Sequence, residues 1–246
     1  DVAPSRGLGD VYKRQIKRYC NNKLAVIGFF TLVLITLIVI IAPPFLPFSE
    51  AEIDPLAFNM PPSAKHLLGG DDVGRDVLSR LLYGGRVSLA VGIFSTAVSV
   101  IVGIPLGMLA AFYRGAFEVV VMRLSDIFMS FPSTILILFL VSMFGPSIIT
   151  VTVVIGVLGW PKFARQIYGS VLSIREKDYI EGAVAIGAKD KLIITRYILP
   201  NAVAPIFISI TFRIASAIIL ESSLSFLGMG VPVSYTHLTL PTNSLV

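Results

Sequence analysis

The sequence predicts an all-α polytopic membrane protein, and three observations lead to this fold class. Of the 246 residues, 55% are hydrophobic and only 14% are charged, against about 25% charged residues in ordinary soluble proteins. The mean hydropathy is +0.84. The apolar residues gather in five long runs, and a bilayer core of about 30 Å is crossed by roughly 20 helical residues. The composition therefore excludes a soluble domain and favours a bundle of membrane-spanning helices.

The five runs define the expected spans in chain order. The first, residues 24–42, is uncharged and is followed by two prolines, without a cleavage motif, which predicts an uncleaved anchor. The other expected spans are residues 87–112, 119–144, 146–161 and 202–231. Lipid offers no partners to backbone groups, so each run is expected to be helical. Gly92, Gly103 and Gly107 in the second span would let neighbouring helices approach closely.

The basic residues between the spans set the expected orientation. Residues 16–23 contain three basic residues and no acidic one, which predicts a cytoplasmic N-terminus. Residues 43–86 contain six acidic residues and are expected to form an extracytoplasmic loop. Residues 162–200 hold seven basic and four acidic side chains and are expected on the cytoplasmic side.

Both ends of the chain differ from the rest. Residues 234–246 have no charge, no helical periodicity and no apolar run. This stretch and residues 8–15 resemble translated sequencing-adapter text, and a short disordered tail is the alternative for the C-terminal stretch. We therefore expect residues 1–15 and 234–246 to be non-native, and the native chain to continue into a sixth span.

The polar segment between the fourth and fifth runs contains the most informative pattern. Residues 178–200 are typical of two short amphipathic helices joined at Gly187, which can take a positive φ, and closed by Pro200. The apolar positions expected on one side are Ile180, Ala183, Val184 and Ile186. This side would dock a partner. A helix resting on the lipid surface is the alternative.

The order of residues in this segment resembles the signature loop of ABC-importer permeases. In that family the loop forms a coupling helix that enters a groove of the cytosolic ATPase. Gly182 stands in place of the usual alanine, which should weaken the helix by up to ~1 kcal/mol, and Tyr197 stands in place of an aliphatic residue. The resemblance assigns ATPase coupling to Glu181, Gly182, Ala183, Gly187, Leu199 and Pro200.

A second resemblance covers residues 66–89, HLLGGDDVGRDVLSRLLYGGRVSL. This stretch is similar to the one that precedes the second span in permeases for dipeptides, oligopeptides and nickel. We expect a short helix with one apolar face, and pairing of Asp76 with Arg75 or Arg80. A structural elbow on the outer membrane surface is the favoured interpretation and direct substrate contact the alternative. His66 alone is not a metal site.

Four charged residues fall inside the expected spans, where charges are costly. Arg123 and Asp126 are three residues apart and are expected to pair, with a role in a gate as the alternative. Arg213 and Glu221 are eight residues apart and share a helix face. Lining of the translocation path and pairing with other helices both remain open for them.

The two resemblances imply a permease bundle with five of its six transmembrane helices present, in a bacterial inner (plasma) membrane. The implied function is import of peptides, with nickel as the alternative. The implied partners are a second homologous permease, two cytosolic ABC ATPases, an extracytoplasmic substrate-binding protein and membrane lipid. No nucleic acid, cofactor or metal is expected. The sequence has no GxxxxGK[ST] motif, so ATP hydrolysis is expected on a partner and the chain itself is not an enzyme.

Two other classes of membrane protein are less consistent with the sequence. A gradient-driven secondary transporter would show inverted repeats, and none is evident. A membrane-embedded hydrolase would need a catalytic set inside the bilayer, but neither His66 nor His237 lies in an expected span. Cys20 is the single cysteine and excludes an internal disulfide or a thiolate metal site.

Overall fold

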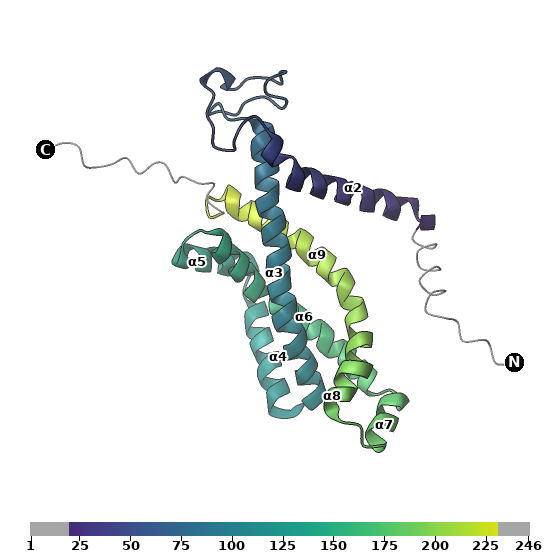
Figure 1. Ribbon diagram of the computed structural model, residues 1–246. Coiled ribbons are helices and arrows are strands. Elements are labelled where there is room, and N and C mark those ends of the chain that lie inside the picture. The colour runs from purple at the N-terminus through teal and green to yellow at the C-terminus, as the bar shows by residue number, and fades with distance from the viewer. Residues whose placement is uncertain (1–19, 231–246) are drawn as a thin grey trace. The chain divides into compact units, whose positions relative to one another are not determined.

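The computed structural model describes residues 20–230, so the expectations for residues 1–15 and 234–246 lie outside the described residues. The helices are α2 (Lys23–Ile41), α3 (Val77–Tyr113), α4 (Gly115–Ser130), α5 (Ser133–Phe144), α6 (Ile148–Arg175), α7 (Asp178–Ala185), α8 (Asp190–Leu192) and α9 (Leu199–Phe226) (Figure 1). Two 3-10 turns, η1 (Pro43–Phe45) and η2 (Pro55–Ala57), and a π-helical turn, η3 (Ile193–Ile198), complete the described elements. The all-α prediction is confirmed for this part of the chain.

Four described helices are long and apolar enough to cross a membrane, and the bent pair α4–α5 would make a fifth. The four are α2, α3, α6 and the continuous helix that α8, η3 and α9 form together. Helix α3 begins at Val77 and so includes the short helix expected before the second span. Helix α6 runs to Arg175, past the expected end of its run at Pro161. Its packing against α4, α5 and α9 holds it helical across this buried proline.

The third apolar run is not one continuous helix. Helices α4 and α5 meet at a bend of 88° across Phe131 and Pro132. Proline lacks the backbone N–H that a continuing helix needs and disfavours the helical conformation of the preceding residue. Phe131 accordingly is extended, with φ −93° and ψ 142°. The expected span 119–144 is therefore divided in two at this point.

The chain divides into two compact units, residues 1–86 and 87–246. In the first, the C-terminal end of α2 is held by polar contacts from the start of α3. The Arg86 guanidinium donates to the carbonyl of Val39 at 3.1 Å and to that of Ile40, and the Tyr83 hydroxyl donates to the carbonyl of Pro43 at 3.3 Å. Helix ends leave such carbonyls without intrahelical partners. These contacts therefore fix the C-terminal end of α2.

In the second unit, glycines bring α3 and α6 into backbone contact. A Cβ added at Gly103 would lie 2.5 Å from the carbonyl oxygen of Trp160, and one at Gly107 would lie 2.1 Å from that of Ala164. Gly92 makes similar room for Ile218 of α9. Small residues of this kind drive helix association in membranes, where apolar burial gives little advantage over lipid. The expectation that these three glycines permit close approach is confirmed.

Candidate functional site

Helix α7 is attached to the bundle by two buried side chains. Ile180 is 2% exposed and Ala183 is 7% exposed, and both belong to an apolar cluster that joins α3, α6, α7, η3 and α9. Tyr179, Val184 and Ile186 are 48%, 59% and 85% exposed. The four apolar residues expected on one docking side therefore do not share one side of α7. Ile180 and Ala183 hold α7 to the unit, whereas Val184 and Ile186 remain on its outer surface.

Gly187 ends α7 in the conformation that the sequence predicts. Its φ is +79°, a value that side-chain-bearing residues rarely adopt. The Gly187 N–H donates to the carbonyl of Val184 at 2.9 Å, and the Ala188 N–H donates to that of Ala183 at 3.0 Å. This pair of bonds is the Schellman arrangement, which satisfies the last carbonyls of a helix. The predicted turn at Gly187 is confirmed, and it gives α7 a defined direction.

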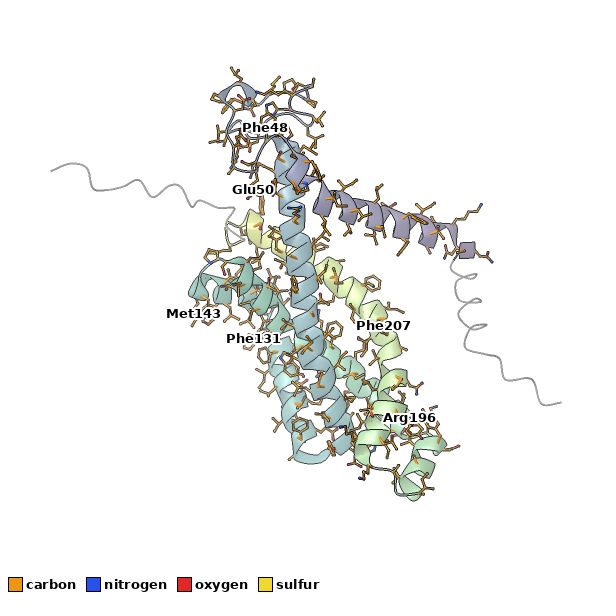
Figure 2. All side chains as sticks on the ribbon, viewed as in Figure 1. Phe48, Glu50, Phe131, Met143, Arg196 and Phe207 are labelled. Atoms are coloured by element: carbon orange, nitrogen blue, oxygen red, sulfur yellow. The ribbon has the colours of Figure 1, made fainter. Side chains whose placement is uncertain are left out.

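Pro200 does not close the segment as expected. The helix that starts at Asp190 continues through Leu199 and Pro200 to Phe226. The turn just before Leu199 is π-helical, and Leu199 and Pro200 form the first residues of α9. In Figure 1, α7 and α8 lie at the same end of the unit as the turn between α3 and α4. Figure 2 places Arg196 at that end too.

Asp126 has a stronger partner than the one expected. It lies 3.9 Å from Arg123 of its own helix, but it accepts a close contact from Arg165 of α6. All three side chains are exposed by 39% or more, and exposed ion pairs contribute only about 0–1 kcal/mol. From the sequence, Arg165 is expected only as one of the loop charges, because the fourth apolar run ends at Pro161. The contact joins α4 to α6.

Arg213 and Glu221 have separate partners on other helices. An Arg213 guanidinium N–H donates to the carbonyl of Ile155 on α6 at 2.7 Å. Gly159 makes room for this guanidinium, because a Cβ there would lie 2.5 Å from its Nη2. Glu221 is buried and accepts hydrogen bonds from the hydroxyl of Ser88 on α3, at 2.6 Å, and from that of Ser225 on its own helix, at 2.7 Å. Arg213 therefore connects α9 to α6, and Glu221 connects α9 to α3.

In the first unit, residues 43–86 enclose a buried polar cluster around His66. The His66 ring lies 3.0 Å from a carboxylate oxygen of Asp76 and 3.3 Å from one of Asp54. The ring also stacks on Phe48, with centroids 4.5 Å apart. Asp76 in turn accepts the Ser79 N–H at 2.7 Å and so caps the start of α3. Contacts 10 and 12 residues apart in a loop carry no periodic signal, so the sequence does not predict this cluster.

The expected pairing of Asp76 with Arg75 or Arg80 is wrong. Both arginines donate to Asp71, with the Arg75 Nε at 2.9 Å. Burial raises the pKa of Asp71, but hydrogen bonds from backbone N–H groups and these two arginines outweigh it and hold the pKa well below its usual range. Asp76 is occupied by His66 and Ser79 instead. Asp54, Asp71 and Asp76 therefore all have partners within this loop or the start of α3.

The pH dependence of this loop follows from Asp54. A 2.5 Å hydrogen bond from Lys65, assisted by the Leu56 N–H, lowers the pKa of Asp54 from 3.8 to about 2. A carboxyl with a depressed pKa stabilises the fold above its ordinary pKa and loses this effect as the pH falls through the folded value. We expect pepsin to cleave residues 43–86 faster in Lys65→Met than in the unsubstituted protein at pH 4.5. The difference should vanish toward pH 2, and a difference independent of pH would contradict this account.

Two protein families match this chain, and together the matches cover most of its length. Residues 103–245 match the family described as "Binding-protein-dependent transport system inner membrane component". Residues 12–62 match the family described as "N-terminal TM domain of oligopeptide transport permease C". The first match includes α7, Gly187 and Pro200, and the second includes α2.

Several similar proteins are named as permease proteins of transport systems. The dipeptide transport system permease protein DppC of Alkalihalophilus pseudofirmus is 37% identical over 219 residues, which are 89% of this chain and 72% of that protein. The oligopeptide transport system permease protein OppC of Bacillus subtilis is 32% identical, over 90% of this chain and 73% of its own length. The glutathione transport system permease protein GsiD of Pectobacterium atrosepticum is 39% identical, over 87% and 71%.

A solved structure is similar in fold. It is a chain of the MetNI methionine ABC transporter in an inward-facing conformation, with a TM-score of 0.54, covering 61% of this chain and 76% of that one. At 22% identity this similarity concerns the fold alone. The family match and the sequence identities to the three permease proteins agree with this similarity in fold. The chain therefore belongs to the binding-protein-dependent transport system inner membrane components, the permease subunits of ABC importers.

Proposed function

We propose that this chain forms part of the path for peptides in an ABC importer and that α7 couples it to a cytosolic ATPase. The observation that carries the coupling proposal is the division of α7 into two sides. Ile180 holds the helix to the bundle while Tyr179, Val184 and Ile186 stay exposed. Glu181 is exposed beside them. The exposed side of α7 is thus largely apolar and carries the Glu181 carboxylate. A helix side of this kind suits a groove on a partner protein.

The proposed assembly has two homologous permeases, two cytosolic ATPases that hydrolyse ATP, and an extracytoplasmic binding protein. If α7 faces the cytoplasm, the α3–α4 turn at the same end of the unit faces it too (Figure 1). The excess of basic residues in 162–200 supports this side, and by alternation we propose a cytoplasmic N-terminus. The expected outer loop is then residues 43–86.

Peptides are the substrate class that we propose. Relatives named for dipeptides, oligopeptides and glutathione support it. Nickel, the alternative within this branch, is not favoured, because these relatives carry peptide names. A gradient-driven secondary transporter is not favoured either, since the matched family is binding-protein-dependent.

The contacts suggest how movement of the ATPase would reach the path. The buried Ile180 and Ala183 make α7 part of the same apolar cluster as α6 and α9, so displacement of α7 displaces both helices. We propose that Arg213 and Glu221 act as ties that keep α9 moving with α6 and α3. The Arg123–Asp126–Arg165 contact would do the same for α4. Rocking of packed helices then opens the path alternately to each side.

Substitutions at two glycines test the coupling. Gly187→Pro removes the N–H that donates to Val184 and forces a φ near −65° in place of +79°. Gly182→Ala is the matched control, because its Cβ would meet nothing within 4 Å and alanine favours helix by up to ~1 kcal/mol. With the permease coexpressed with its ATPases, we expect Gly187→Pro and Glu181→Lys to abolish ATPase copurification and Gly182→Ala to retain it.

The same complexes test the substrate class. In vesicles supplied with the binding protein and ATP, the unsubstituted complex and Gly182→Ala should take up labelled dialanine. Nickel uptake without dialanine uptake would refute the peptide assignment. Unchanged ATPase association in both Gly187→Pro and Glu181→Lys would refute the coupling assignment.

A further inference from the structure

The helix that leads from the coupling segment into α9 contains a π-helical turn. Residues Ile193–Ile198 form this turn, and the N–H of Leu199 donates to the carbonyl of Ile194, five residues back. A π turn holds one more residue than the α-helical turn it replaces, and such turns are frequent at functional sites. The surrounding helix is continuous from Asp190 to Phe226. The extra residue thus lies between α7–α8 and the body of α9.

Pro200 gives a physical cause for the turn. In a regular α-helix the ring of Pro200 would clash with the carbonyl of Arg196, and no N–H would be available to that carbonyl. A wider turn relieves the clash without ending the helix. The chain thereby keeps one continuous connection where a proline would otherwise kink it.

Packing holds one side of the turn and leaves the other open. Ile193, Ile194 and Ile198 are 1%, 7% and 0% exposed and belong to the cluster that also contains Ile180 of α7. Thr195 is exposed on the opposite side, as is Arg196 (Figure 2). The isoleucines therefore fix one side of the turn, whereas the residues on its other side are not held by the apolar cluster.

The side chain of Asn201 connects α9 to this turn. Its Nδ2 donates to the carbonyl of Tyr197 at 2.7 Å, four residues back. Pro200 has no N–H, so the neighbouring carbonyls depend on other donors. Asn201 supplies one from an exposed position on the first turn of α9. This contact fixes the register in which α9 follows the π turn.

We propose that η3 is the joint through which movement of α7 enters α9, and that Asn201 is the positioning residue that sets its register. A shift of the turn by one residue would rotate the preceding helix by roughly 100° relative to α9, since an α-helix has 3.6 residues per turn. The proposal rests on the coupling role proposed for α7. It adds that coupling efficiency depends on one side-chain hydrogen bond away from the docking surface.

Two substitutions of nearly equal size test this hydrogen bond. Asn201→Ala removes the donor, whereas Asn201→Ser keeps one, because a serine hydroxyl bonds to the carbonyl four residues back. The complete importer is reconstituted in vesicles, and dialanine uptake is divided by ATP hydrolysed. We expect Asn201→Ala to assemble with the ATPases but to lower this ratio about fivefold, the factor for a hydrogen bond of ~1 kcal/mol. Asn201→Ser should restore it.

Each outcome bears on the proposal. An unchanged ratio in Asn201→Ala, or an equal fall in both variants, overturns the role of Asn201. Loss of assembly in Asn201→Ala also overturns it, because the contact would then be structural. If both Gly187→Pro and Glu181→Lys retain ATPase association, the coupling role of α7 fails and the joint with it. If only the Asn201 result fails, the coupling role of α7 stands.

Discussion

Gly107→Ala is expected to destabilise the 87–246 unit severely, although alanine is the better helix former. The new Cβ would lie 2.1 Å from the carbonyl oxygen of Ala164 and 2.6 Å from a methyl group of Ile167. The first neighbour is backbone, so relief requires α3 and α6 to separate. Overpacking typically costs about 1–3 kcal/mol, and here it acts against the approach that holds the two helices together. The midpoint of thermal unfolding in detergent measures the effect.

Gly169→Ala is the control for this substitution. Gly169 lies in α6, and a Cβ there meets nothing within 4 Å. Helix propensity alone should then raise stability by up to ~1 kcal/mol. The two Gly→Ala changes are thus expected to shift the midpoint in opposite directions. A similar shift in both would show that the α3–α6 contact is not the determinant.

His66→Ala is expected to open the loop of residues 43–86. The substitution removes a ring that is 1% exposed and leaves the buried Asp76 carboxylate without it. An unsatisfied buried group costs about 1–3 kcal/mol, and more when it is charged. The cap that Asp76 gives to α3 should also loosen, because His66 orients that carboxylate. Trypsin should therefore cleave after Lys65, Arg75 and Arg80 much faster at neutral pH.

Asp72→Ala provides the comparison for the loop. Asp72 is an exposed carboxylate in the same segment, so its loss should leave the cleavage rate close to that of the unsubstituted protein. If His66→Ala were cleaved no faster than Asp72→Ala, the His66 cluster would not be what holds the loop.

Local signals in the sequence were enough for some features and not for others. Apolar runs predicted helices, and Gly187 predicted a positive φ, because both depend on residues close in the chain. Proline was ambiguous: Pro105 and Pro161 lie inside continuous helices, whereas Pro132 accompanies a bend of 88°. The same residue gives both outcomes because neighbouring helices decide whether a helix continues past it.

The candidate site shows the same division. The sequence indicated the amphipathic character of α7 but not which apolar residues face the bundle, since Ile180 and Val184 are equivalent in hydrophobicity alone. The partner of Asp126 was missed because it required the side-by-side packing of α4 and α6. The π turn at Ile193–Ile198 also has no recognised sequence pattern. Pro200 is a local signal near this turn, but from the sequence alone a proline predicts the end of a helix.

Helix α2 has a further consequence for how this chain can vary. Of its residues only Val39 is buried, and its apolar side chains surround it evenly. Within the first unit, Val39 packs on Gly85 of α3, because a Cβ at position 85 would lie 3.1 Å from the Cγ1 of Val39. A larger side chain at position 85 therefore requires a smaller one at position 39. In related sequences, we expect these two positions to change together.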